Sequence, residues 1–233
     1  FPYTTLFRSL RLYQEMYDTA GYRVKVLPCS VLSAETAGWF KKPINNVDDF
    51  KGLNIRFYGL GARVLEKLGA STSLLPAGEL FGALEKGVID ATEFSMPAID
   101  YRLGLHKVAK YNYFPGWHQQ TTFGELLLHK PTWESMSKRQ QTIIETVCRA
   151  SIITTLSVGE WIQPQFMQKA QEEHGVDIRK WTPEQLDAFR QAWMLVVEEE
   201  RQKDPFFRKV WDNLNGFREQ YAIWKRNAFL PLE

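Results

Sequence analysis

The alternation of short strands and helices between Phe50 and Asp100 constrains the fold more than any other part of this 233-residue chain. Alternating strand and helix patterns cover residues 53–57, 62–68, 73–75, 79–86 and 88–94. Strands separated by helices are typical of an α/β layer with parallel pairing. We therefore predict an α/β protein whose functional groups stand at the strand ends of this layer.

The rest of the chain extends this pattern at both ends. A strand is expected at 22–27, a loop with a short helix at 30–40, and one long helical pattern over 131–174 that could tie two domains together. The run from Thr182 to Gln185 is a capping box that begins another helix. We divide the chain into a remnant of a first lobe (1–50), the core of a second lobe (51–117), a return strand with the long helix (118–175), and a C-terminal helical region (176–233).

Composition excludes some classes of function. The net charge of +2 gives no reason to expect a nucleic-acid partner. The four histidines show no metal-binding spacing, so a zinc site is not expected. Cys29 and Cys148 both lie in apolar surroundings and are expected to be buried, unpaired thiols. No nucleophile stands beside a base in any recognisable motif, which favours a binding protein over an enzyme.

Arg56 and Glu93 are the charged groups that carry the functional hypothesis. Arg56 ends an apolar strand, where its charge needs a partner, and Glu93 follows another strand. A planar guanidinium is suited to clamping a ligand carboxylate in a bidentate manner. The alternatives are a structural salt bridge for Arg56 and a surface carboxylate for Glu93.

The run Gly59-x-Gly61 offers a rival interpretation from another class, an NAD(P)-dependent enzyme. It follows a strand and opens a helix, as a dinucleotide fingerprint does, but the third glycine is missing. No acidic strand end stands at the usual distance either. We therefore prefer to interpret the two glycines as a tight turn that brings a helix N-terminus near the cleft.

Three runs of sequence give a more specific indication: GWFKKPINNVDDFKGLNIRFYGLGARVLEKLGA, LLPAGELFGALEKGVIDATEF and LGLHKVAKYNYFPGWH. In this order they resemble the DctP-type solute-binding proteins of TRAP transporters, and most closely the branch that binds 2-oxo acids and similar monocarboxylates. The resemblance covers the chain from about Leu10 to its end. It implies a non-enzymatic periplasmic receptor that delivers an organic acid to the membrane permease subunits.

The resemblance also implies an architecture. Members of the family have two α/β lobes of the periplasmic-binding-protein type (type II-like) that close on the ligand, with a long helix crossing both lobes. They begin with a signal peptide and a βαβ portion of the first lobe, and neither is present here. We therefore expect an N-terminally truncated receptor. A sensor ectodomain and a receptor for a dicarboxylate or a sugar acid remain alternatives.

The family pattern also implies roles for individual residues. Arg56 matches the ligand-clamping arginine, and Glu93 and Phe94 match the acidic–aromatic pair that holds a cation. Glu35 stands where the 2-oxo-acid branch usually has Gln and is expected to contact both substrate and metal. Gln119 stands where Glu usually ends a Gly-Trp-Trp-Glu run, and Trp117 belongs to the same run. The resemblance implies that both residues bind the substrate.

The expected cation is calcium or sodium, and charge arithmetic slightly favours calcium. A ligand carboxylate, Glu93 and Arg56 leave one negative charge, which a monovalent ion neutralises. Glu35 adds a second, and a divalent ion bound by oxygen ligands would restore neutrality. A protonated or solvent-facing Glu35 would leave a sodium site unchanged. Separately, the apolar stripe from Phe207 to Trp224 predicts a homodimer contact through the C-terminal helix, with packing inside the chain as the alternative.

Overall fold

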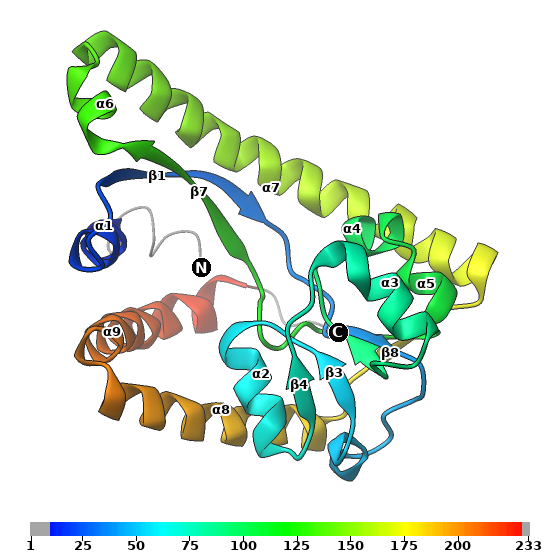
Figure 1. The fold of residues 1–233 in the computed structure, drawn as a ribbon. Helices are drawn as coiled ribbons and strands as arrows, with labels where there is room; N and C mark the ends of the chain where they lie inside the picture. Colours follow the sequence, from blue (N-terminus) through cyan, green and yellow to red (C-terminus); the bar gives the residue numbers. More distant parts are fainter. Residues whose placement is uncertain (1–9, 230–233) are drawn as a thin grey trace. The chain divides into compact units, whose positions relative to one another are not determined.

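The computed structural model describes residues 10–229 and has mixed α/β structure, as expected (Figure 1). The chain divides into two compact units, each assembled from segments that are separated in sequence. Unit 1 comprises residues 1–30, 123–152 and 198–233, and unit 2 comprises residues 31–122 and 153–197. The core predicted at 51–117 therefore lies wholly in unit 2, whereas the segment 118–175 is shared between the units.

Unit 1 is built around a two-stranded sheet of β1 (Val24–Leu32) and β7 (Thr122–His129). Its helices are α1 (Leu10–Thr19), α6 (Lys130–Ser135), the first part of α7 (Lys138–His174) and α9 (Pro205–Ala228). Leu27 from β1 and Trp133 from α6 lie at the centre of its core. β1 extends through residues that the sequence assigned to a loop.

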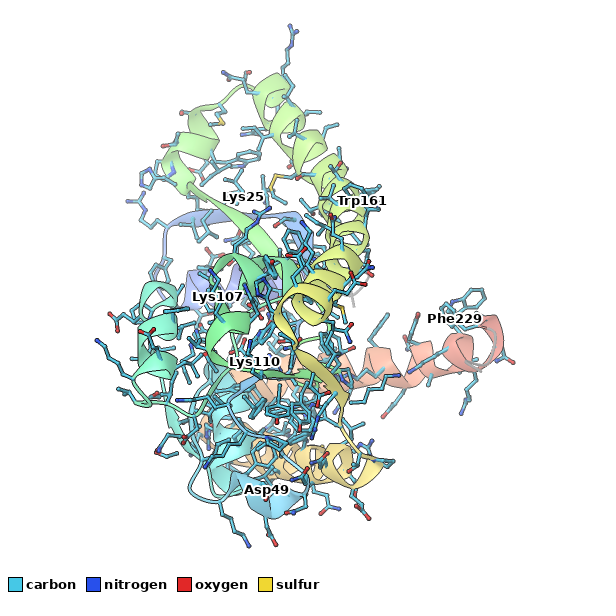
Figure 2. All side chains as sticks on the ribbon, turned by 90° about the vertical axis from the view of Figure 1, so that its right-hand side faces the viewer. Lys25, Asp49, Lys107, Lys110, Trp161 and Phe229 are labelled. Atoms are coloured by element: carbon cyan, nitrogen blue, oxygen red, sulfur yellow. A yellow bond between two sulfur atoms is a disulfide. The ribbon has the colours of Figure 1, made fainter. Side chains whose placement is uncertain are left out.

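A disulfide joins Cys29 on β1 to Cys148 on α7, within the core of unit 1 (Figure 2). The prediction of unpaired thiols was therefore wrong. The two cysteines are 119 positions apart, and their Cα atoms lie 4.0 Å apart. Nothing in the local sequence of either cysteine indicates this pairing, because the approach of β1 to α7 is a long-range contact.

Unit 2 contains a six-stranded sheet in the order β4-β3-β5-β2-β6-β8. The strands are β2 (Gly38–Phe40), β3 (Asn54–Arg56), β4 (Ser71–Ser73), β5 (Ala91–Thr92), β6 (Tyr111–Phe114) and β8 (Asp177–Lys180). Pairing is parallel between β3 and β4, β3 and β5, and β6 and β8, as the alternation of strands and helices predicts. β2 is antiparallel to both β5 and β6, so the sheet is mixed. The short-helix region expected at 30–40 contains this central strand instead.

The helices of unit 2 bury apolar side chains in two core clusters. They are the 3-10 helix η2 (Val47–Phe50), the α-helices α2 (Gly59–Lys67), α3 (Ala77–Glu85), α4 (Pro97–Arg102) and α5 (Leu105–Val108), the second part of α7, and α8 (Pro183–Lys203) up to Val197. One cluster holds Phe40, Phe50 and Phe189, and the other holds Trp39 and Leu80. The predicted capping box is present: Thr182 N–H donates to Gln185 Oε1 (2.9 Å), and Gln185 N–H donates to Thr182 Oγ1 (3.2 Å).

α7 begins in unit 1 and ends in unit 2, so one long helix contributes to both units. Pro164 lies inside it without ending it. Among the described residues, it is the one helix that is long and apolar enough to cross a membrane, and 11% of the relevant window is buried. Trp161, which is 75% exposed, stands on its outer surface (Figure 2).

Candidate functional site

Adjacent strand ends bring Arg56 and Glu93 together in unit 2. Arg56 is the last residue of β3 and pairs with Thr92, the last residue of the parallel strand β5. Glu93 therefore follows directly beside Arg56, and its N–H donates to the Arg56 carbonyl (3.0 Å). Arg56 Nη1 lies 2.9 Å from Glu93 Oε2, in an ion pair whose side chains are 8% and 4% exposed. The two charged residues singled out from the sequence thus lie in direct contact, and the ion pair named as an alternative for Arg56 is present.

Further contacts hold the Arg56 guanidinium in place. Nη1 also donates to the Glu93 carbonyl (2.5 Å), and Nε donates to the Leu75 carbonyl (3.4 Å). The Arg56 Cζ atom lies 5.3 Å from the centre of the Phe94 ring, in cation–π distance. The Phe94 ring therefore covers the arginine. These neighbouring segments of the chain together fix the orientation of the guanidinium.

A turn at residues 116–119 is fastened to Glu35 from both sides. Gly116 N–H donates to the Glu35 carbonyl (3.1 Å), and Glu35 N–H donates to the Gln119 carbonyl (3.2 Å). A side chain at position 116 would overlap that same Glu35 carbonyl oxygen, so this close approach requires glycine. The turn therefore sets the positions of His118 and Gln119 relative to Glu35.

The Gln119 side chain orients the Glu35 carboxylate. Gln119 Nε2 donates to Glu35 Oε1 (2.8 Å) and is also hydrogen-bonded to Thr122. Glu35 is 4% exposed, and its other oxygen, Oε2, has no hydrogen-bond partner among the described residues. The structure thus brings together Glu35 and Gln119, two residues singled out from the sequence.

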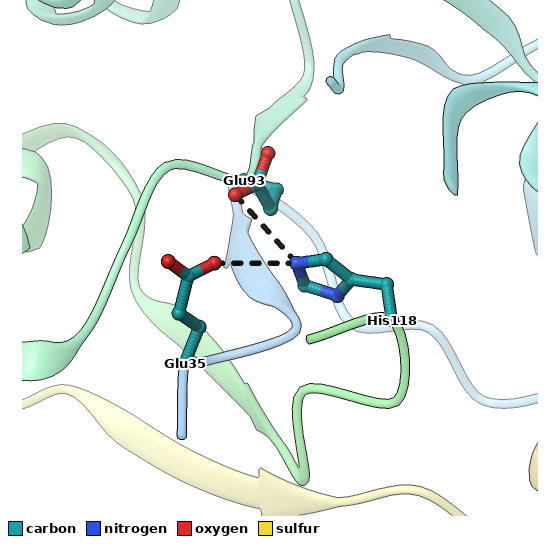
Figure 3. Close-up of side chains that lie close together, drawn as sticks. All are labelled: Glu35, Glu93 and His118. Carbon is teal, nitrogen blue, oxygen red and sulfur yellow. Dashed lines mark ion pairs between the residues drawn. The ribbon is translucent and has the colours of Figure 1, made fainter. Parts of the chain in front are cut away.

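The His118 imidazole faces both buried carboxylates, as Figure 3 shows. Its Nε2 atom is 3.5 Å from Glu35 Oε2 and 3.6 Å from Glu93 Oε1, and its side chain is 8% exposed. Sequence reasoning missed this residue, because the three groups come from separate segments and form no ligand motif. The signal available was its place beside Trp117 and Gln119 in a run already under consideration.

Burial and mutual proximity shift the proton equilibria of this cluster. Burial raises the pKa of Glu35; the neighbouring His118 imidazole opposes this rise, and the nearby Glu93 carboxylate adds to it. Burial lowers the pKa of His118, but its contacts with Glu35 and Glu93 outweigh that effect, and the net shift is upward. A cation bound between Glu35 and His118 would therefore compete with the protons on these two groups.

Trp117 has a different environment from the one that the sequence suggested. Its ring stacks on Phe189 (centroids 4.6 Å apart) and on Phe57 (5.7 Å), at the edge of one core cluster of unit 2. Phe57 in turn contacts the His118 ring edge-to-face at 4.8 Å. Trp117 thus supports the wall behind His118, and we find no contact that places its ring on the carboxylates in the described residues.

The free atoms of the cluster fit a single cation. Glu35 Oε2, Glu93 and His118 each offer one donor atom, and these atoms lie within 4.8 Å of one another. Buried polar atoms without partners, here Glu35 Oε2 and His118 Nε2, are costly unless something binds them. The expected metal contacts of Glu35 and Glu93 are therefore geometrically feasible, and the metal role expected of Phe94 stays a prediction.

Comparison with known proteins identifies the family. Residues 18–204 match the model for bacterial extracellular solute-binding proteins, family 7 (DctP). The chain belongs to this family. The match includes the whole of unit 2, so the Arg56–Glu93–His118–Glu35 cluster lies inside the family domain.

The ligands of several similar family 7 proteins are known. The chain is 32% identical to a monocarboxylate 2-oxoacid-binding periplasmic protein of Nostoc sp., over 97% of the chain and 61% of that protein. A TRAP periplasmic solute-binding protein of Colwellia psychrerythraea, solved with calcium and pyruvate, is 30% identical (TM-score 0.89; 97% of this chain, 69% of that one). One of Pseudoalteromonas atlantica, solved with sodium and pyruvate, is also 30% identical (TM-score 0.88; the same coverage).

These comparisons confirm the fold class. The family 7 chain has the mixed α/β fold of TRAP solute-binding proteins, with two compact units and a long helix. It spans 61% of the length of the Nostoc relative and 69% of the two solved chains. The ligands named for those proteins are therefore bound by chains longer than this one.

Proposed function

We propose that this chain forms part of an extracytoplasmic solute receptor of a TRAP transporter, which binds a small monocarboxylate such as a 2-oxo or 2-hydroxy acid. The observation that carries the proposal is the buried Arg56 guanidinium, held by Glu93 at a strand end within a family 7 domain. Nη1 and Nε already donate to Glu93 and Leu75, so the ligand carboxylate would accept charge-assisted hydrogen bonds from Nη2. The name of the Nostoc relative and the pyruvate-bound structures support the same ligand class.

A bridging cation belongs to the proposal. The solved relatives bind their acid together with calcium or sodium. Here Glu35 and Glu93 contribute two buried carboxylates and Arg56 contributes one compensating charge. A ligand carboxylate increases the excess of negative charge, and a divalent cation offsets it, as the charge arithmetic from the sequence predicts. Gln119 acts in this proposal by orienting Glu35, and Trp117 by supporting His118.

The family supports a periplasmic location and a membrane permease as partner. The Nostoc relative is named a periplasmic protein, and the solved relatives are TRAP periplasmic proteins. The disulfide between Cys29 and Cys148 supports an oxidising compartment. The chain would act by binding and delivery, without catalysis, and would hand its ligand to the permease subunits.

Two alternatives remain for the test. A dicarboxylate or sugar-acid receptor would use the same arginine. The other is a nucleotide-binding enzyme built on Gly59-x-Gly61. It is disfavoured because packing already explains why residue 61 is glycine: a Cβ there would come within 2.5 Å of the Phe57 ring. Since Phe57 also supports His118, Gly61 serves packing beside the cluster.

The test is a ligand screen by thermal shift, followed by calorimetry, on the chelator-treated chain with cations added back. Pyruvate and lactate should raise the unfolding temperature, because a ligand that binds only the folded state stabilises it by mass action. Succinate, glucuronate and NADH serve as comparison ligands. A larger shift with any of these three than with the monocarboxylates would favour an alternative.

We further propose that α9 makes a homodimer contact. Trp224 and Ile223 near its end are 61% and 62% exposed, whereas Trp211 is buried and belongs to the packing of unit 1. Trp224→Glu should therefore convert a dimer to a monomer in light scattering without unfolding the chain. A wild-type chain that is monomeric at high concentration contradicts this contact.

A further inference from the structure

The Glu35–Glu93–His118 cluster contains a nitrogen donor, and this changes which cation it suits. We propose that His118 Nε2 is a direct metal ligand and that the site prefers a divalent transition-metal ion, Zn²⁺ in particular, over Ca²⁺ and Na⁺. The preference concerns the cation of the proposed receptor, but metal binding can be measured without any organic acid. The two proposals can therefore fail separately.

The spacing of the donor atoms is that of groups around one small ion. His118 Nε2 lies 3.5 Å from Glu35 Oε2 and 3.6 Å from Glu93 Oε1 (Figure 3). Zinc bonds of about 2.0–2.2 Å in a tetrahedron place neighbouring donor atoms about 3.4 Å apart. The site is thus spaced for coordination before any ion enters.

Each carboxylate is already held by its other oxygen. Glu35 Oε1 accepts from Gln119 Nε2, and Glu93 Oε2 accepts from Arg56 Nη1. This leaves Glu35 Oε2 and Glu93 Oε1 facing His118. Hydrogen-bonded partners behind the ligands orient metal sites in this way, and they reduce the reorganisation needed when an ion binds. The His118 ring is set by the edge-to-face contact with Phe57 instead.

The donor chemistry decides between the candidate ions. Calcium takes six to eight oxygen ligands, whereas imidazole nitrogen suits zinc and other late transition metals. Open zinc sites have three protein ligands drawn from histidine, carboxylate and cysteine and leave a fourth position free, and two carboxylate oxygens with one imidazole supply the same number of ligands of the same types. In the receptor, a ligand carboxylate would occupy that fourth position.

Charge is consistent with a divalent ion. Glu35, Glu93 and Arg56 together carry one negative charge, so a divalent cation with neutral His118 leaves one positive charge. A monocarboxylate ligand then brings the buried cluster to neutrality. The competing arrangement is a protonated His118. Its positive charge would neutralise the cluster without a metal ion, and its proton would lie where the ion would bind.

The experiment is calorimetry of the chelator-treated chain near neutral pH, with zinc and calcium titrated separately and no organic acid present. We expect one zinc ion per chain, bound about tenfold or more tightly than calcium. His118→Gln replaces the nitrogen with an amide oxygen, so zinc affinity should fall about tenfold or more while calcium affinity is kept. The matched control is His129→Gln, which removes an exposed histidine bonded to Thr132 and should leave zinc affinity unchanged.

X-ray absorption of the zinc-loaded wild-type chain gives a readout that needs no variant. Imidazole scattering from one histidine per zinc supports the proposal. The proposal is overturned if the wild type binds calcium as tightly as zinc, if it binds no zinc, or if His118→Gln keeps wild-type zinc affinity. Zinc binding without any organic-acid binding would instead contradict the proposed receptor function and leave the metal site standing.

Discussion

Arg56 is the residue whose burial depends most on its neighbours. A guanidinium that is 7% exposed needs hydrogen-bond partners, and here it has the carboxylate and carbonyl of Glu93 and the carbonyl of Leu75. Lysine could supply the charge but not the fork of donors. The geometry of this one side chain therefore links the stability of unit 2 to ligand binding.

Arg56→Lys should weaken binding of a monocarboxylate by about 2–5 kcal/mol, because one partner of a buried charge pair is lost or misplaced. Calorimetry with pyruvate measures this directly. The control is Arg190→Lys on the exposed surface, where the ion pair with Asp187 contributes little. Near-native affinity in the Lys variant would falsify the clamping role.

Asp100 gives a prediction about pH. It is fully buried and accepts a hydrogen bond from Trp39 Nε1 (2.8 Å). Burial raises its pKa from 3.8 to about 8; the Trp39 hydrogen bond opposes this rise, and Glu93 and Glu35 add to it. The folded state therefore keeps a proton that the unfolded state releases between these pH values.

Stability from this group is fully present below pH 3.8 and is lost as pH rises towards about 8. The slope is at most about 1.4 kcal/mol per pH unit. Asp100→Asn, which keeps an acceptor for Trp39, should remove this loss in urea unfolding measured across the window. The exposed Asp187→Asn change is the control and should keep the wild-type pH dependence. An equal slope in wild type and Asp100→Asn would contradict the assignment.

At the scale of elements, the turn at 116–119 connects the sheet to the cluster. It follows β6 and is tied to Glu35, which precedes β2, and β2 and β6 are neighbours in the sheet. Pairing of these strands therefore brings the turn and Glu35 together. The contact can be this close because Gly116 has no side chain.

Gly116→Ala should destabilise the chain by about 1–3 kcal/mol, because its Cβ would overlap the Glu35 carbonyl and force the backbone to shift. Metal affinity should fall with it, since His118 belongs to the same turn. Gly82→Ala in α3 is the matched control: a Cβ there would meet nothing within 4 Å beyond its own helix, so it should stabilise the chain by up to about 1 kcal/mol. Unfolding and zinc titration of both variants decide the point.

At the scale of the whole molecule, the disulfide closes a long loop. It links β1 to α7 across 119 positions, within a core cluster of unit 1. A cross-link over so long a loop restricts the unfolded chain strongly. We therefore expect unit 1 to depend on oxidation more than unit 2.

The double change Cys29→Ser and Cys148→Ser should lower the free energy of unfolding by about 2–4 kcal/mol. Adding reductant to the wild type should have a similar effect, and reductant should not affect the double variant. Thiol titration of the unfolded, non-reduced wild type should detect no free cysteine. Two titratable thiols in that experiment would show that the pair is not formed.

Local sequence rules predicted much of unit 2. Strand, glycine and helix alternate over 50–100 because periodicity and helix-ending glycines act within a few residues. The capping box at Thr182 is likewise a local pattern. Arg56 and Glu93 could be brought together from sequence because parallel strands that are joined by helices end at the same edge of a sheet.

The tertiary structure alone decided what depends on distant segments. The antiparallel insertion of β2 and the disulfide both join parts of the chain that no short pattern relates. His118 became a candidate metal ligand only because strand pairing and the Gly116 contact place its ring beside Glu35 and Glu93. The identities of the donor groups were readable in the sequence, but their convergence on one point was not, because it is set by packing between segments and not by the propensities of any one of them.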